Sequence, residues 1–106
     1  MSETQQYQVI VQERAREMLV AHARFLSQDS ISAVEMLVDE FEEKAALLKE
    51  NPERCPWLSD PMIPSYKYRK LLFGKRCLLI FQVIDRVVSI DAVVDCRQDY
   101  GWLLPS

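Results

Sequence analysis

The chain has 106 residues and a mass of 12.4 kDa, and 49% of its residues are hydrophobic. This is enough for one modest core and excludes a two-domain protein, so residues 1–106 are treated as a single domain. The apolar runs fall far short of the roughly 18 residues of a membrane span, and the N-terminus lacks the basic and then apolar profile of a signal peptide. We expect a soluble, cytoplasmic protein with no membrane partner.

The net charge of -3 conceals two oppositely charged parts of the chain. Residues 1–50 hold twice as many acids as bases, whereas residues 65–97 hold seven bases and three acids. A locally basic sheet on an acidic protein can hold a polyanion at one face. The alternative is that these lysines and arginines only keep the sheet edges soluble.

The first half of the chain changes from a strand pattern to a helical one. Residues 7–12 are rich in β-branched residues and predict an opening strand. Residues 13–28 place apolar side chains, Phe25 among them, at steps of three and four, which predicts an amphipathic helix with His22 on its apolar stripe. A lone histidine there is more often a core or boundary residue than a ligand or base.

A second helix follows a short polar turn. Ser32 starts a capping-box pattern with Glu35, and Ser30 is a competing N-cap. The connection of about five residues makes the two helices antiparallel neighbours. Four of the five prolines then fall between 52 and 64 and predict a stiff, extended connection. Its apolar anchors are Trp57, Leu58, Met62 and Ile63.

From Tyr66 the pattern predicts three neighbouring antiparallel strands, with turns at 74–75 and 85–86. Residues 77–81 ("CLLIF") are continuously apolar and should be the most buried segment. In the last strand, strict alternation would place Val88, Ile90, Ala92 and Val94 on one face and Ser89, Asp91, Val93 and Asp95 on the other. Continued, the alternation places Arg97 on the polar face. The expected fold is β-α-α-β-β-β, an α+β arrangement with a helical hairpin on one face of a small, mainly antiparallel sheet.

Several kinds of site are excluded by residue types and spacing. Cys55, Cys77 and Cys96 match neither a disulfide framework nor paired zinc ligands, so we interpret them as reduced thiols. A reactive cysteine would need a base, and the one histidine lies on the helical stripe. With two glycines in all, the chain has no glycine-rich phosphate loop. We expect no metal and no cofactor.

What remains is a set of cations and tyrosines on a short sheet. Cleavage of a phosphodiester by its own 2'-hydroxyl needs a base, a cation for the developing charge and a proton for the leaving oxygen. Arg97, Arg69 and Lys67 can supply charge, and Tyr100 can stack on a base or assist proton transfer. Arg97 fits equally well in a structural ion pair with a neighbouring aspartate, Asp95 or Asp99.

Four segments in this order resemble the RelE/ParE superfamily of bacterial toxins from type II toxin-antitoxin (plasmid stabilisation) systems: "YQVIV", "ENPERCPWL", "YKYRKLLFGKRCLLIFQV" and "VVSIDAVVDCRQDYGWLL". The resemblance runs from Tyr7 to Leu104. It implies a compact α/β toxin that a cognate antitoxin neutralises. RelE-like members cleave messenger RNA in the ribosomal A site without a metal, whereas ParE-like members keep the fold and act on DNA gyrase.

The resemblance also implies roles for particular residues. Arg97 matches the basic residue after the last strand, Arg69 matches the arginine of "YRKL", and Tyr100 lies where RelE-like members carry a terminal aromatic; these three are the predicted catalytic residues. The predicted RNA-binding residues are Lys67, Lys70, Lys75 and Arg76. We therefore expect a toxin that inhibits translation by ribosome-dependent mRNA cleavage as an mRNA interferase. The alternatives are a gyrase-binding toxin and a degenerate, non-catalytic member.

Overall fold

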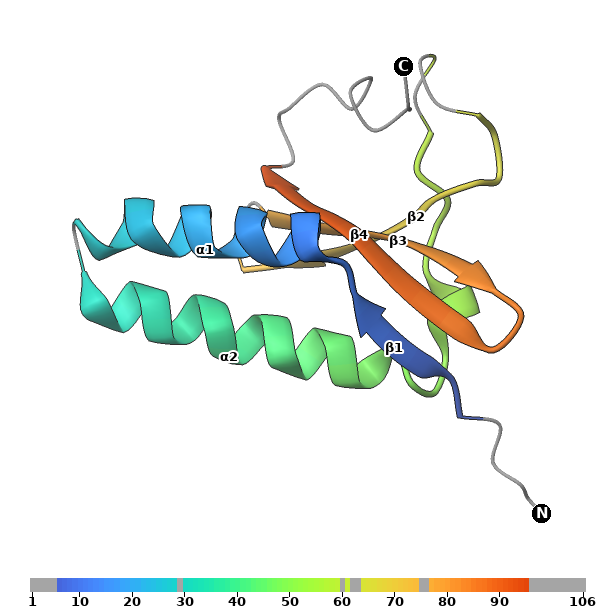
Figure 1. The fold of residues 1–106 in the computed structure, drawn as a ribbon, viewed down its shortest axis with the longest axis horizontal. Helices are drawn as coiled ribbons and strands as arrows, with labels where there is room; N and C mark the ends of the chain where they lie inside the picture. The colour runs from blue at the N-terminus through green and yellow to red at the C-terminus, as the bar shows by residue number, and fades with distance from the viewer. Residues whose placement is uncertain (1–5, 29, 60, 62–63, 75–76, 96–106) are drawn as a thin grey trace.

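The computed structural model describes residues 6–28, 30–59, 61, 64–74 and 77–95. A helical hairpin packs on one face of a four-stranded sheet (Figure 1), which confirms the predicted α+β fold and its order of elements. The elements are β1 (Gln8–Val11), α1 (Glu13–Ser27), α2 (Ile31–Leu47), the short 3-10 helix η1 (Pro52–Arg54), β2 (Arg69–Phe73), β3 (Cys77–Ile84) and β4 (Val87–Asp95).

The strands lie in the order β1-β4-β3-β2. β2, β3 and β4 form the predicted antiparallel meander. β1, which precedes both helices in the chain, pairs in parallel with β4. Gly74 and Asp85 take positive φ angles of 59° and 56° in the two tight turns. β2 begins at Arg69 rather than at Tyr66, because Tyr66 has a φ of 62° and interrupts the extended backbone.

The two helices form as predicted, with one correction to each pattern. Ser30, not Ser32, is the N-cap of α2, since its hydroxyl accepts a hydrogen bond of 3.1 Å from the backbone N–H of Ala33. Phe25 lies on the predicted stripe of α1 but is 67% exposed near the end of the helix, whereas Ala15 is fully buried. Neither helix of the described residues is both long and apolar enough to cross a membrane.

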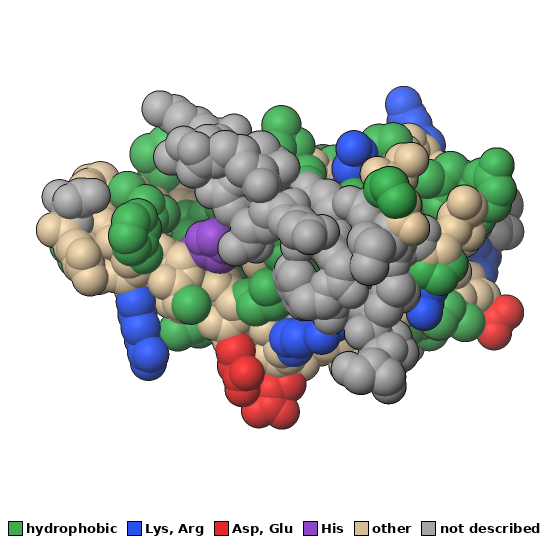
Figure 2. Space-filling model, turned by 90° about the horizontal axis from the view of Figure 1, so that it is seen from above, with side chains coloured by type: hydrophobic (Ala, Val, Ile, Leu, Met, Phe, Trp, Pro, Cys, Tyr) green, Lys and Arg blue, Asp and Glu red, His purple; other side chains and the backbone are tan. Residues whose placement is uncertain are grey.

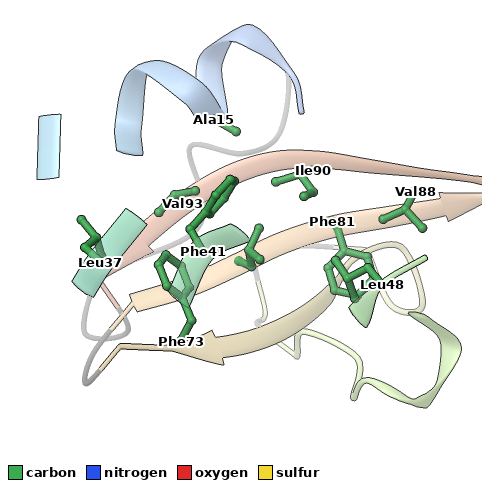
Figure 3. Packing of buried hydrophobic residues seen from close by; sticks show 10 residues of the cluster. Ala15, Leu37, Phe41, Leu48, Phe73, Phe81, Val88, Ile90 and Val93 are labelled. Atoms are coloured by element: carbon green, nitrogen blue, oxygen red, sulfur yellow. The ribbon is translucent and has the colours of Figure 1, made fainter. Parts of the chain in front are cut away.

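The main core lies between the helical hairpin and the sheet (Figure 3). Phe41 of α2 meets Phe73 of β2 edge to face, with ring centroids 5.8 Å apart and planes at 66°. Leu79 and Phe81 of β3 are fully buried, as is Ile80 on the other face of the strand, so the prediction that "CLLIF" is the most buried segment is confirmed for its central residues. This packing fixes β3 as the centre of the molecule.

The predicted alternation in β4 is wrong after Ile90. Phe81 pairs with Ile90 but Ile80 pairs with Ala92, so Asp91 is an extra residue in a β-bulge. The bulge inverts the alternation: Val93 joins Val88 and Ile90 in the main core, whereas Ala92 and Val94 lie in a second cluster. The prediction that Arg97 lies on the polar face assumed an uninterrupted alternation, so the bulge removes its basis. Arg97 itself lies outside the described residues.

The second cluster covers part of the sheet face opposite the helices. Leu58 comes from the proline-rich connection, and the other members come from the strands or their flanks: Tyr68, Leu78, Ile80, Ala92 and Val94. The connection lies along β2, because the N–H of Leu58 donates to the carbonyl of Tyr68 at 2.7 Å and the N–H of Lys70 donates to the carbonyl of Pro56 at 3.1 Å. The connection therefore pairs with the outer edge of β2 at the start of that strand.

Candidate functional site

The structure describes some of the predicted site residues and not others. Arg97, Tyr100, Lys75 and Arg76 lie outside the described residues, as do Cys96, Met62 and Ile63. Arg69, Lys67 and Lys70 are described: Arg69 and Lys70 are the first two residues of β2, and Lys67 lies two residues before it. The geometry of these three residues therefore tests whether β2 gathers cations at one point.

Arg69 holds the proline-rich connection against β2. Its Nη1 donates to the backbone carbonyls of Cys55 at 2.7 Å and Glu53 at 3.1 Å. The guanidinium carbon also lies 3.7 Å from the centroid of the Trp57 ring, a cation–π contact. These contacts give Arg69 a structural role, and its predicted catalytic role stays a prediction.

The three cations do not all lie on one side of the sheet. Neighbouring residues of a strand face opposite sides of the sheet, so Arg69 shares a side with Leu71 and Phe73 of the main core, while Lys70 lies on the other side. The ammonium of Lys67 lies 5.4 Å from the ring centroid of Tyr68, a residue of the second cluster. Arg69 and Lys70 therefore do not converge on one phosphate-sized ligand.

Trp57 and Tyr66 form an aromatic pair beside Arg69. Their rings meet edge to face, with centroids 5.5 Å apart and planes at 81°. Trp57 is 38% exposed and Tyr66 is 75% exposed, so the pair is a surface feature. The prediction that Trp57 and Leu58 pin the connection is confirmed, since Leu58 is buried and Trp57 forms a β-bridge with Arg69. The role of Tyr66 had no sequence signal beyond its place after Pro64 and Ser65.

A polar network surrounds the β-bulge. The carboxylate of Asp91 accepts hydrogen bonds of 2.6 Å from the hydroxyl of Ser89 and from the amide nitrogen of Gln82, and Gln12 donates to Ser89 at 2.9 Å. Burial raises the pKa of the nearby Tyr68 hydroxyl, and the negative charge of Asp91 raises it further, against an opposing effect of Arg14. Because its carboxylate accepts two hydrogen bonds, Asp91 stabilises the bulge and is not a free base.

His22 lies in an apolar hollow at the C-terminal end of α1. The hollow has a volume of about 310 Å³ and is lined by Met18, Ala21, His22, Phe25 and Val93. Figure 2 shows His22, in purple, among apolar side chains. No other titratable side chain of the described residues lines the hollow, which agrees with the interpretation of His22 as a boundary residue. None of the described residues forms a group that could hold a metal ion.

Cys55 is a free thiol, as predicted. Burial raises the pKa of the Cys55 thiol above its ordinary value of 9.0, and the positive charges of Arg69 and Arg54 oppose this only in part. A thiol with a raised pKa is a poor nucleophile at neutral pH. The described part of the chain therefore presents a cationic and aromatic surface at the start of β2.

Comparison with known proteins places this geometry in a family. The sequence model described as "ParE toxin of type II toxin-antitoxin system, parDE" matches residues 9–100. No curated protein is similar enough in sequence to count as a match. Among solved structures, the chain resembles the chromosomal ParDE system from P. aeruginosa, with a TM-score of 0.70 and 13% identity over 87% of this chain and 98% of that chain.

The chain also resembles an E. coli RelE toxin with two arginine-to-alanine substitutions, in the free state. Here the TM-score is 0.57 with 20% identity, over 92% of each chain. At these identities the two structures show the shared fold, and the sequence match supplies the family. Together they confirm the predicted superfamily: the chain belongs to the ParE toxin family of type II toxin-antitoxin systems.

Proposed function

We propose that this type II toxin arrests growth by binding DNA gyrase, and that its cognate antitoxin neutralises it by covering the toxin. The family match supports the ParE-like alternative, for which the resemblance in sequence implies action on DNA gyrase. A binding toxin needs a shaped and charged surface and does not need converging acid–base groups. The described surface at the start of β2 has this character.

The observation that carries the proposal is the position of Arg69. A catalytic arginine must present its guanidinium to the developing phosphorane charge. In this chain Nη1 of Arg69 donates to two backbone carbonyls and the guanidinium stacks on Trp57, so only Nη2 and Nε are left for a ligand. Since Lys70 lies on the opposite side of the sheet, β2 does not assemble the cations that a ribonuclease site would use.

Ribosome-dependent mRNA cleavage is the second candidate. It is favoured by the sequence after β4, where Arg97 and Tyr100 follow the last strand in the order that RelE-like members show. Under this candidate Arg97 stabilises charge on the phosphate, and Tyr100 stacks on a base or assists proton transfer. Lys67, Lys70, Lys75 and Arg76 would then hold the RNA backbone.

Induced expression in a bacterial host separates the two candidates. Three readouts are scored together: the DNA-damage response, the rate of translation, and the integrity of messenger RNA. Gyrase binding predicts damage signalling with intact messages. Early translation arrest with cleaved messages and no damage signalling would overturn the proposal in favour of the ribonuclease, and cleavage should then be lost in an Arg97→Ala variant. Unchanged growth would identify a degenerate member and contradict both candidates.

A further inference from the structure

One surface of the molecule combines exposed aromatic rings with positive charge. We define the aromatic–cationic patch as Trp57, Tyr66, Lys67 and Arg69, where the connection after α2 meets β2. In Figure 2, Lys and Arg side chains lie among apolar side chains at the right-hand end of the molecule, the end at which Figure 1 shows this connection. We propose that the patch is the surface through which the toxin binds an acidic region of its protein target. This inference rests on the proposed function, because it names the surface for that binding.

The patch is held rigid before any partner arrives. Arg69 is fixed by two hydrogen bonds to the connection and by its stacking on Trp57. The backbone on either side of Trp57 is bonded to β2 through Pro56 and Leu58. Tryptophan, tyrosine and arginine are the residue types that most often dominate binding energies at protein interfaces, and a preorganised group loses little conformational entropy on binding.

The backbone conformation and the exposure of Tyr66 are not explained by the packing of the fold. Its φ of 62° lies in the left-handed region, which is unfavourable for a bulky side chain. Its ring is 75% exposed, so burial offers little to offset this backbone conformation. Glycine or asparagine would suit the same backbone better. A strained, exposed aromatic residue is consistent with a side chain that is retained for binding.

The positive charges of the patch have no described counter-ion. Neither Lys67 nor Arg69 forms a salt bridge with another residue of the described part, and both hydrogen bonds of Arg69 use Nη1. A guanidinium carries five donors, so Nη2 and Nε remain for a carboxylate of a partner. The chemistry that fits is therefore an acidic protein surface with an apolar group that packs on Tyr66.

A protein partner fits the patch better than a single-stranded nucleic acid. Nucleic acids bind to a groove of cations that follows the backbone, with bases stacked on open ring faces. Here one face of Trp57 is already covered by Arg69, and the edge-to-face contact with Tyr66 adds to this covering. The next cation along β2, Lys70, lies on the other side of the sheet, so the charges do not form a continuous track.

Variants of Tyr66 test the patch without damaging the fold. In a Tyr66→Gly variant the relief of the strained conformation offsets the greater entropy of the unfolded chain, and we expect a thermal midpoint close to that of the wild type. We also expect its affinity for purified gyrase to fall by about tenfold, the loss of a modest interface hot spot. Tyr66→Phe keeps the ring and should bind within about threefold of the wild type. Ile31→Ala is the matched control, because Ile31 is 65% exposed at the far end of the helical hairpin.

The outcomes distinguish this inference from the proposed function. If the wild type binds gyrase and Tyr66→Gly binds equally well, the patch is overturned and the function stands. If the wild type does not bind gyrase, the proposed function fails. The patch is then tested by comparing the growth arrest caused by the wild type and by the Tyr66 variants at matched protein levels. If growth arrest is lost in Tyr66→Gly and kept in Tyr66→Phe, the patch is supported as the binding surface for another protein target. If Tyr66→Gly still arrests growth fully, the patch is overturned. Reduced affinity of Tyr66→Gly for a single-stranded RNA oligonucleotide, with gyrase binding unchanged, also overturns it.

Discussion

Arg69 offers the sharpest test of structural against catalytic roles at the start of β2. Replacing it by methionine keeps an unbranched side chain of similar reach and removes every donor. The half-buried hydrogen bond to Cys55 contributes about 1 kcal/mol and the exposed one to Glu53 about 0.5 kcal/mol. Stacking on Trp57 adds about 0.5 kcal/mol at a partly exposed site.

The loss of about 2 kcal/mol from these contacts should lower the Tm of an Arg69→Met variant by about 10 °C for a domain of this size. Arg69→Lys should lose roughly half as much, because one ammonium keeps the charge but cannot hold both carbonyls and stack on Trp57. Lys70→Met is the matched control, since Lys70 makes no side-chain contact of this kind with the described residues, and its Tm should change little.

Thermal unfolding followed by circular dichroism measures these differences directly. An Arg69→Met variant with the Tm of the wild type would contradict the structural role of Arg69. If that variant had also lost toxicity, Arg69 would act on a ligand, either on RNA, as the ribonuclease candidate requires, or on the protein partner of the aromatic–cationic patch. If the variant is destabilised and the remaining folded protein keeps its activity at low temperature, Arg69 is a structural residue.

Three further predictions concern the helix cap, the bulge and alkaline pH. Ser30→Ala should lower the free energy of unfolding by about 1 kcal/mol in urea titrations, because the N–H of Ala33 loses its acceptor; no loss would mean that another group caps α2. Asp91→Ala should cost about 1 to 2 kcal/mol, and Asp91→Asn less, since two donors at 2.6 Å lose their acceptor; equal stabilities would contradict the proposed role of the network. Burial raises the pKa of Cys55 above 9.0 and of Tyr68 above 10.0, so the unfolded chain ionises first and stability should fall as pH rises beyond 9; a Cys55→Ser/Tyr68→Phe variant should lose part of this alkaline dependence.

The fold follows from patterns that are local in the sequence. Helical spacing predicts α1, and the change to continuous apolar residues predicts β3, because the periods of 3.6 and 2 are set by backbone geometry. The N-cap was ambiguous between Ser30 and Ser32, since both serines precede the same apolar stripe. Only the contact with Ala33 decides between them.

The features that sequence patterns missed depend on residues far apart in the chain. The bulge at Asp91 is stabilised by Gln82 of β3 and by Ser89, and nothing in "SIDAVV" distinguishes it from a regular strand. Arg69 looked like an open cation because its acceptors lie 14 and 16 residues away, in the connection. The sequence thus predicted which residue types lie at the candidate site, but it predicted only part of how their side chains are arranged.

The most direct test of the central claim is the supercoiling activity of DNA gyrase in the presence of purified toxin. Relaxed plasmid, gyrase and ATP are incubated with increasing toxin, and the product topology is resolved on a gel. The proposed function predicts that supercoiling falls with toxin concentration and that cognate antitoxin restores it. Undiminished supercoiling at a large excess of toxin that still arrests growth in cells would contradict the account.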